Sequence, residues 1–302
     1  MTELVLAIFG PTASGKSAVA EEVAARVPAQ VISADALQAY RGLPLLTNQP
    51  QRTTRLVGVW PLEHEGSVGE YQRLAHAAID EVLAAGETPI VAGGTGLYLR
   101  AALAEIGLPS PPRAGARERW EQLYDEAGAE PAHAELRRRD AEAANVVHPN
   151  DRRRVVRALE LAEAGSTLRP MHDRLWSGAS RHPTVVFGLE VLRDVLSSRI
   201  ETRARAMFDA GVEEEVRGVL HSPLSRTAAA ALGLREIAEL PREEAIEALI
   251  RRTRSYAAYQ RKWMRRIPGL VSVDANRSPG PIADEILDVA RARQRLPAGR
   301  AL

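Results

Sequence analysis

One stretch limits the fold of this chain more than any other feature. Residues 10–17 read GPTASGKS, which fits the pattern G-x-x-x-x-G-K-[ST]. An apolar run typical of a buried strand, Glu3–Phe9, precedes it, and a helical pattern follows from Lys16 to about Val27. Glycines between a strand and a helix let backbone N–H groups converge on phosphate oxygens at the positive end of the helix. The stretch therefore predicts a phosphate-binding loop, and the alternative is an ordinary glycine turn.

The residue types within this loop indicate what it binds. Lys16 adds a positive point charge, and the hydroxyl of Ser17 can ligate Mg²⁺. We expect the loop to hold a pyrophosphate or polyphosphate through Gly10, Pro11, Thr12, Ala13, Ser14, Gly15, Lys16 and Ser17.

Strand-like runs alternate with helical patterns along the chain. Further strands are expected at Gln30–Ser33, Leu56–Trp60, Pro89–Ala92, Val185–Val191 and Leu270–Val273. A helical pattern at Val68–Ala85 separates two of them, and the chain after the last is helical to about Arg295. Strands that alternate with helices predict an α/β fold, here a P-loop NTPase-like parallel sheet flanked by helices.

The character of the sequence changes in the middle. Prolines at positions 109, 111 and 112 interrupt the pattern, and Arg- and Glu-rich sequence with little strand signal follows to about residue 181. We expect a helical insertion domain over residues 109–181, set into a catalytic core made of residues 1–108 and 182–302.

Composition excludes several classes of protein. The chain has 302 residues, 45% of them hydrophobic and 26% charged, as expected for a soluble protein with a sizeable core. It contains no cysteine, which excludes disulfides, Cys-based zinc sites and thiolate nucleophiles. We find no apolar run long enough to cross a membrane and no signal peptide pattern, and so expect a cytoplasmic protein that does not contact membranes.

One acidic residue is placed to act beside the phosphate-binding loop. Asp35 follows the second expected strand, and the carboxyl ends of parallel strands meet at the edge of the sheet where ligands bind. A carboxylate there could ligate a metal or act as a general base, although it could also be an ordinary helix N-cap or turn residue. The expected strand Pro89–Ala92 ends instead in GGTG, where many P-loop NTPases place an Asp on the metal.

The longer motifs occur in a specific order. GPTASGKS is followed by ISADALQAYRGL from Ile32, IVAGGTGLYLRAAL from Ile90 and HPNDRRRVVRALEL from His148. LSSRIETRARAMFDAGVEEEV from Leu196, ALGLRE from Ala231 and TRSYAAYQRKWMRR from Thr253 complete the set. This collinear set, which covers nearly the whole chain, resembles the bacterial tRNA dimethylallyltransferases, also called tRNA isopentenyltransferases.

The resemblance implies a function. Members of this family transfer the dimethylallyl group of dimethylallyl diphosphate to N6 of the adenosine on the 3′ side of the anticodon (position 37), in tRNAs that read codons starting with U. Diphosphate is released, with Mg²⁺ as the cofactor. The resemblance thus implies tRNA, through its anticodon stem-loop, and dimethylallyl diphosphate as partners, and we expect a monomer.

The resemblance also implies roles for individual residues. Asp35 matches the catalytic carboxylate that accepts the N6 proton, and Thr95 and Arg199 match groups that act on the departing diphosphate. Arg203 lies one helical turn after Arg199 and could share its face, or could be an exposed helix residue. The positions matched to tRNA binding are Asp35, Ala36, Leu37, Gln38, Arg153, Arg154, Arg157, Arg235, Arg254, Gln260 and Arg261.

One of these predictions has an independent basis in the residues. Residues 251–266 contain seven basic residues and no acidic one, interleaved with Tyr256, Tyr259 and Trp263, and such mixtures suit a phosphate backbone and unstacked bases. The alternative is an exposed arginine-rich helix anchored by aromatic side chains. The resemblance also implies that Gln38 meets the target adenine, whose edge its amide could hydrogen-bond once the base has left its stack.

The chain departs from the family pattern at several positions near these motifs. Ala36 stands where the family usually has serine, Gln49 where it has lysine in G-T-A-K-P, and Thr54 where histidine is common. Ala258-Tyr259 replaces a typical Lys-Arg pair. These differences affect the expected contacts with tRNA more than the expected chemistry.

Three interpretations therefore remain open from the sequence. The first is the tRNA prenyltransferase. The second is a P-loop kinase of a small molecule or nucleotide, or a relative that prenylates free adenine nucleotides; neither needs the basic C-terminal segment. The third is an RNA-binding protein that keeps the fold without turnover, which Asp35, Lys16 and Thr95 argue against.

Overall fold

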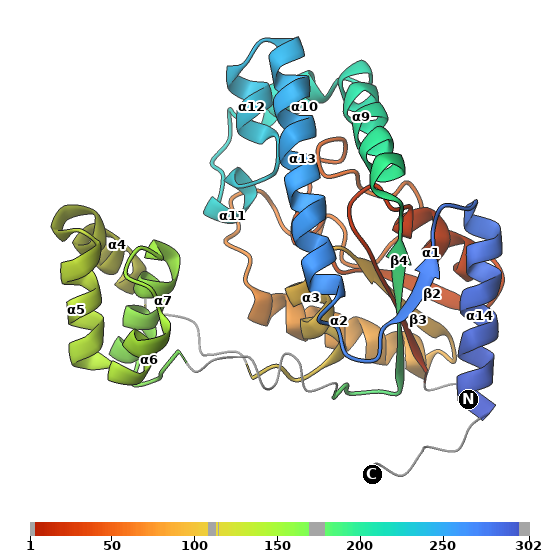
Figure 1. Ribbon diagram of the computed structural model, residues 1–302, viewed down its shortest axis with the longest axis horizontal. Coiled ribbons are helices and arrows are strands. Elements are labelled where there is room, and N and C mark those ends of the chain that lie inside the picture. The colour runs from red at the N-terminus through yellow and green to blue at the C-terminus, as the bar shows by residue number, and fades with distance from the viewer. Residues whose placement is uncertain (1–3, 108–112, 114, 169–178, 296–302) are drawn as a thin grey trace. The chain divides into compact units, whose positions relative to one another are not determined.

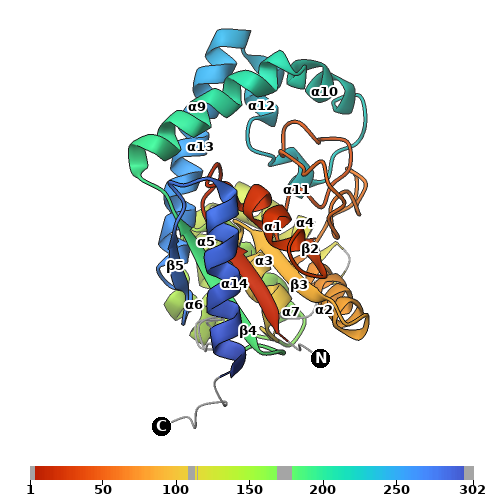
Figure 2. The same ribbon diagram turned by 90° about the vertical axis from the view of Figure 1, so that its right-hand side faces the viewer.

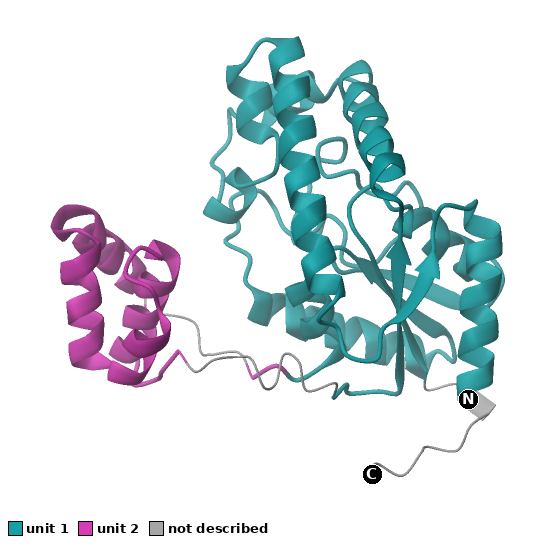
Figure 3. Cartoon of the chain, in the orientation of Figure 1, with its two compact units in different colours: residues 1–105, 176–302 teal, residues 106–175 magenta. Residues whose placement is uncertain are grey.

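The protein divides into two compact units. A computed structural model describes residues 4–107, 113, 115–168 and 179–295. Unit 1 comprises residues 1–105 and 176–302, and unit 2 comprises residues 106–175 (Figure 3). Glu3 and the prolines at 109, 111 and 112, which figured in the expectations above, lie outside the described residues.

Unit 1 is built on a five-stranded parallel sheet. Its order is β2-β3-β1-β4-β5, so the strand that leads into the phosphate-binding loop is the central one. All five residues of that strand are buried, as expected where helices cover both faces. The strands are β1 (Val5–Phe9), β2 (Ala29–Ser33), β3 (Thr88–Gly93), β4 (Thr184–Glu190) and β5 (Val271–Asp274).

Helices cover both faces of this sheet. One face carries α1 (Lys16–Ala24) and α14 (Pro279–Arg295), which contact each other, and the other carries α2 (Val68–Ala84) and α3 (Gly96–Leu103) (Figures 1 and 2). The side chain of Ser67 caps α2 by accepting a hydrogen bond from the N–H of Glu70. The α/β fold with a parallel, P-loop NTPase-like sheet is thus confirmed.

A second group of helices stands above the carboxyl ends of the strands (Figure 1). The helix that follows β4 packs along the long helix α13, and two shorter helices complete the group. They are α9 (Arg193–Asp209), α10 (Val212–Val219), α12 (Leu234–Glu239) and α13 (Arg242–Met264), with the single turn α11 (Arg226–Ala229) between α10 and α12. Two of these helices, α9 and α13, contact the phosphate-binding loop through Arg203 and Gln260.

The expected strand at Leu56–Trp60 is wrong. Only isolated bridges occur there, between Arg55 and Ile32 and between Trp60 and Tyr40. Leu56 and Gly58 have positive φ angles of 64° and 63°, which turn the backbone out of the extended conformation that a strand requires. The apolar residues of this segment therefore pack in a loop.

Unit 2 is a small helical domain. It consists of α4 (Ala116–Ala127), α5 (Ala129–Arg139), α6 (Ala141–Val146) and α7 (Arg152–Glu163). Asp140 caps α6 and Asp151 caps α7, each accepting a backbone N–H three residues on. Its core is made of small and branched apolar residues: Ala132, Leu136, Ala143, Ala144, Val147, Val155, Ala158 and Leu159.

No helix among the described residues is both long and apolar enough to cross a membrane.

Candidate active site

The phosphate-binding loop has the conformation that its sequence predicts. Gly15 has a φ of 91° and forms the N-cap of α1, and Ala13 also has a positive φ, of 63°. The N–H of Ser14 donates to the carbonyl of Pro11 at 3.1 Å, which closes the loop. The unpaired N–H groups of the first turn of α1 consequently face the space in front of the loop, where they favour an anion.

A cavity of about 400 Å³ lies at this loop. We call it the P-loop cavity. Its walls come from the loop itself, from the residues after β2, and from α9 and α13: Thr12, Ala13, Gly15, Lys16, Ser17, Ala18, Asp35, Gln38, Thr47, Asn48, Ala92, Gly93, Arg199, Arg203, Tyr256 and Gln260. Of the predicted diphosphate ligands, Gly10, Pro11 and Ser14 lie behind this surface and are buried.

Three cations and one carboxylate set the charge of the cavity. Desolvation lowers the pKa of Lys16 to about 8, with Asp35 acting to raise it and Arg203 to lower it. Burial also lowers the pKa of Arg203, against the opposing effect of Asp35. Arg199 lines the same cavity and donates to the carbonyl of Ala275 at 3.3 Å. Positive charge thus accumulates in a desolvated space, and a bound diphosphate would offset the cost of that arrangement.

Asp35 closes a turn and also lines the P-loop cavity. Its Oδ1 accepts the N–H of Leu37 at 3.0 Å and that of Gln38 at 3.4 Å, so it closes a turn after β2. The same residue lines the P-loop cavity and a second, smaller pocket beside it. The turn therefore fixes the carboxylate at the junction of two cavities.

The second pocket measures about 80 Å³, and about half of its lining is apolar. It shares six residues with the P-loop cavity, so the two spaces adjoin: Thr12, Asp35, Thr47, Asn48, Arg203 and Tyr256. We call it the apolar pocket, after the seven aliphatic residues that line it: Leu37, Leu46, Ile200, Ala204, Met207, Leu232 and Leu249. Thr253 completes the lining.

Glycines bring the loop after β3 into the site. A Cβ at Gly96 would meet the ring of Trp263 at 2.2 Å, so only glycine lets α13 lie this close to α3. The preceding residue, Thr95, has its Oγ1 3.4 Å from the phenol oxygen of Tyr256. Thr95 does not line the P-loop cavity itself, although Gly93, two residues earlier, and its contact Tyr256 both do.

Two residues predicted to contact tRNA form hydrogen bonds within the chain. The amide oxygen of Gln38 accepts from Ser33 at 2.9 Å, and its nitrogen donates to the carbonyl of Asn48 at 2.9 Å. Gln260 is 2% exposed and bonds Thr12 and Gly94. Both amides therefore have hydrogen-bond partners within the protein.

Tyr256 is the site residue whose position the sequence did not indicate. It lines both cavities, and burial raises the pKa of its phenol to about 12, so the hydroxyl remains a donor at neutral pH. Its spacing of four from Gln260 on one helix was the available signal, since such residues share a face.

The basic residues of α13 line a separate groove of about 650 Å³ between α9 and α13. Arg254, Arg261 and Lys262 contribute cations from α13, Arg265 contributes one from the C-cap of that helix, and Arg193 contributes one from α9. Arg254 pairs with Glu201 at 3.5 Å. This groove is larger than either cavity around Asp35, and neither Asp35 nor Lys16 is among the residues that line it.

The other predicted tRNA contacts on unit 1 lie at or near the surface. Arg235 is exposed and pairs with Glu239 of its own helix at 3.0 Å. Ala36 and Leu37 are half-buried in the turn that Asp35 closes, and Leu37 lines the apolar pocket.

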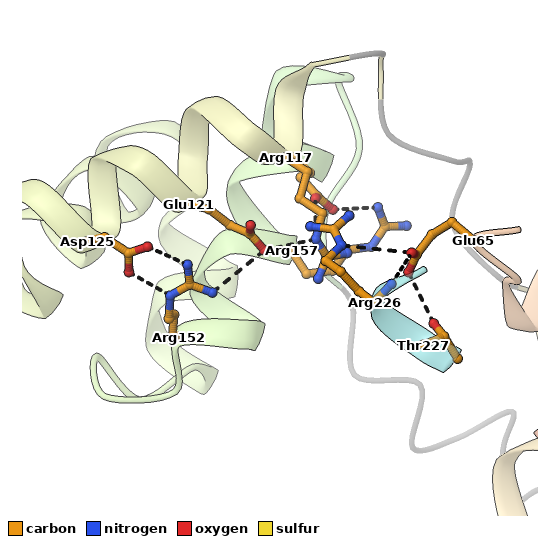
Figure 4. Close-up of polar contacts among 9 residues, drawn as sticks. Glu65, Arg117, Glu121, Asp125, Arg152, Arg157, Arg226 and Thr227 are labelled. Atoms are coloured by element: carbon orange, nitrogen blue, oxygen red, sulfur yellow. Dashed lines mark hydrogen bonds and ion pairs between the residues drawn. The ribbon is translucent and has the colours of Figure 1, made fainter. Parts of the chain in front are cut away.

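Unit 2 holds the remaining predicted contacts on α7. Arg153 and Arg154 are exposed, whereas Arg157 pairs with the buried Glu160 at 2.9 Å. Their neighbour Arg152 donates to both carboxylate oxygens of Asp125, at 2.8 and 2.6 Å (Figure 4). The arginines nearest the helix start thus divide into those held by acids and those facing solvent.

Two of the arginines on α5 pair with a nearby acid. Glu135 pairs with Arg138 at 2.7 Å and also with Arg139. The hydrogen bond from Arg138 is the largest influence on the pKa of Glu135, which is lowered to about 2.

Fold and site together define a P-loop protein in which a phosphate cavity and an apolar pocket meet at one carboxylate. Comparison with known proteins gives the family. The model of the IPP transferase family matches residues 38–267, and that of the isopentenyl transferase family matches residues 3–54. The chain belongs to the IPP transferase family, which confirms the resemblance to tRNA dimethylallyltransferases.

Individual relatives align with this chain over most of their length. The tRNA dimethylallyltransferase of Thermobifida fusca is 40% identical, with 87% of this chain and 88% of that protein covered. That of Corynebacterium jeikeium is 36% identical, with 92% and 93% covered. The crystal structure of the tRNA isopentenylpyrophosphate transferase of Bacillus halodurans has a TM-score of 0.70 at 28% identity, with 97% of each chain covered.

Proposed function

We propose that this protein transfers the dimethylallyl group of dimethylallyl diphosphate to N6 of the adenosine 3′ to the anticodon, in tRNAs that read codons starting with U. One observation carries the proposal. Asp35 is one of six residues that line both the P-loop cavity and the apolar pocket, so a diphosphate and a small branched hydrocarbon can both lie next to one carboxylate.

The diphosphate end belongs at the P-loop. Its charge would be met by the ammonium of Lys16, the N–H groups at the start of α1, and the guanidinium groups of Arg199 and Arg203. Arg203 already donates to the hydroxyl of Thr12 at 2.7 Å and is therefore held in place before any ligand arrives. Donors fixed in advance stabilise the charge that develops as diphosphate leaves.

Mg²⁺ fits this arrangement. Mg²⁺ bound to phosphates uses few protein ligands, and the described part of the chain has no group of three or more acidic or histidine residues placed to hold a metal ion. The hydroxyl of Ser17 lines the P-loop cavity and is the residue that would hold the ion beside the phosphate oxygens. When bound, the ion would neutralise charge on the leaving diphosphate.

The reaction then follows from the position of Asp35. The adenine N6 forms a bond to C1 of the dimethylallyl group while the bond from C1 to the diphosphate oxygen breaks. The N6 proton goes to the carboxylate of Asp35, because the lone pair of N6 is delocalised into the ring and the amine is a poor nucleophile while it keeps that proton. Lys16, Arg199 and Arg203 retain the diphosphate as its charge grows.

The acceptor is a macromolecule in this proposal. The groove between α9 and α13 presents Arg193, Arg261, Lys262 and Arg265 to solvent, which suits a phosphate backbone. A free adenine nucleotide would not need a cationic groove beyond the catalytic cavities. We propose further that the protein acts on tRNA in the cytoplasm and does so as a monomer.

A kinase is the less favoured alternative. Strand β3, which pairs with β1, ends at Gly93 and is followed by Gly94. A P-loop kinase commonly places a metal-binding Asp at this point. The apolar pocket next to Asp35 would also have no function in phosphoryl transfer to a polar acceptor.

The departures from the family pattern acquire structural roles. The amide of Gln49 donates to the carbonyl of Tyr40 at 2.7 Å and to that of Gln38 at 3.3 Å. It therefore supports the turn after Asp35 rather than supplying a charge to RNA. Tyr259 is 54% exposed and packs edge-on against Trp263, so an aromatic surface replaces a cation at this point of α13.

Acceptor choice tests the proposal. Radiolabelled dimethylallyl diphosphate and Mg²⁺ are incubated with unmodified tRNA reading a U-starting codon, and in parallel with AMP or ATP. We expect label in the tRNA alone. Label in the free nucleotide would instead support the relative that prenylates adenine nucleotides, and consumption of ATP with phosphate transfer would support the kinase.

A further inference from the structure

Gln260 is buried between two loops that are far from it in sequence. It lies on α13 with 2% of its surface exposed, and its carboxamide reaches the phosphate-binding loop. Oε1 accepts the N–H of Thr12 at 2.7 Å, and Nε2 donates to the carbonyl of Gly94 at 3.0 Å. The side chain therefore ties the P-loop to the loop after β3.

Only an amide of this length satisfies both partners. Thr12 presents a donor and Gly94 an acceptor, so the orientation of the carboxamide is fixed by its neighbours. A glutamate would place an acceptor against the carbonyl of Gly94, and a leucine would leave both backbone groups unpaired. Gly94 is part of the arrangement, because a Cβ there would meet Nε2 at 2.2 Å.

Thr12 is held by Gln260 and also by Arg203, one of the cations of the P-loop cavity. Gln260 holds the backbone of Thr12, and Arg203 holds its hydroxyl at 2.7 Å. The N–H of Thr12 is thereby used inside the protein, so this residue is an anchor for the loop. The loop that follows it, through Lys16, is then presented to the cavity in one conformation, which lowers the cost of ordering it on binding.

We propose that Gln260 is a positioning residue for the P-loop and does not contact RNA. Its neighbours on the outer side of α13, Arg261 and Lys262, are exposed and line the groove between α9 and α13. Helix α13 thus carries cations of the groove on its exposed side. On its buried side it carries Gln260, which holds the phosphate-binding loop. The inference rests on the proposed function for the identity of the diphosphate, but not for the binding of the anion.

The test separates anion affinity from RNA affinity. Binding of inorganic pyrophosphate with Mg²⁺ is measured by calorimetry on the full chain, and binding of unmodified tRNA by filter retention. We expect Gln260→Leu to weaken pyrophosphate binding about tenfold, with tRNA affinity within about twofold of wild type. Arg261→Ala, the adjacent exposed control, should do the reverse.

Two safeguards keep the test decisive. Thermal unfolding shows whether Gln260→Leu folds; if it does not, Gln260→Glu makes the same comparison, since it still accepts from Thr12. Weaker tRNA binding with unchanged pyrophosphate affinity would overturn the proposal and restore Gln260 as an RNA contact. Because pyrophosphate binding needs neither a prenyl group nor RNA, a wild type that binds it but transfers no label would refute the proposed function alone.

Discussion

Gly93, the last residue of β3, lies so close to Ala34 that a Cβ at position 93 would meet the Ala34 carbonyl oxygen at 2.2 Å. Ala34 is the residue before Asp35, and its N–H donates to the carbonyl of Ala92 at 2.8 Å. The missing side chain at Gly93 therefore lets the end of β2 continue alongside β3, and this contact sets where the carboxylate of Asp35 enters the site.

Gly93→Ala should consequently destabilise the protein and displace Asp35. The neighbouring atom is backbone, which cannot move aside cheaply, and overpacking of this kind costs about 1–3 kcal/mol or more. The matched control is Gly218→Ala, because Gly218 lies in α10 with no atom within 4 Å of the place where a Cβ would stand, and this change should be neutral or stabilising. Urea unfolding measures both, and equal stabilities of the two variants would contradict the account.

Arg203 and Arg205 lie on the same helix, but their substitution should have very different effects on the KM for dimethylallyl diphosphate. Arg203 lines the P-loop cavity and donates to Thr12, whereas Arg205 is exposed and pairs with Glu201 at 3.5 Å. We expect Arg203→Gln to raise the KM for dimethylallyl diphosphate about 10- to 100-fold, and Arg205→Gln to change it less than about twofold. Initial rates at saturating tRNA give both values, and similar KM values for the two variants would exclude Arg203 from diphosphate binding.

The pKa of Lys16 predicts how affinity for the diphosphate depends on pH. Desolvation lowers this pKa to about 8 in the free protein, and only the protonated amine attracts the anion. Below pH 8 the amine is charged and binding is full. Above it, a proton must be taken up on binding, so affinity should fall by up to about tenfold per pH unit.

Lys16→Arg is the control for this pH dependence. A guanidinium stays charged across the range, so the variant should show a flat profile between about pH 7 and pH 9.5, whatever its absolute affinity. The measurement is the dissociation constant of dimethylallyl diphosphate by calorimetry. A wild-type profile as flat as that of the variant would show that Lys16 does not control binding.

Local sequence patterns predicted the parts of the site that local structure creates. The phosphate-binding loop and Asp35 each follow directly from a strand, so a parallel sheet brings them to one edge. The predicted strand at Leu56–Trp60 is wrong because the apolar residues of this segment pack in a loop, in which Leu56 and Gly58 have positive φ angles. A leucine in that conformation is not foreseeable from its residue type.

Long-range contacts account for what the sequence could not reveal. Gln260 is 248 positions from Thr12, and nothing in its surroundings on a basic helix indicates a buried amide. Gln38 was predicted to hydrogen-bond a base, but the fold places Ser33 and Asn48 beside its carboxamide, and both form hydrogen bonds with it. The phenol of Tyr256 likewise enters the site only because α13 crosses the end of β3 close to Thr95.

The most direct test of the central claim is label transfer to tRNA by the variant Asp35→Asn. The asparagine oxygen can still accept from Leu37, so the turn is retained while the base is removed. With radiolabelled dimethylallyl diphosphate, Mg²⁺ and unmodified tRNA, we expect wild type to label the tRNA and the variant to be slower by about 10²- to 10⁴-fold, with dissociation constants for both substrates little changed. A variant that transfers label at the wild-type rate would contradict the assignment of Asp35 as the base at the junction of the two cavities.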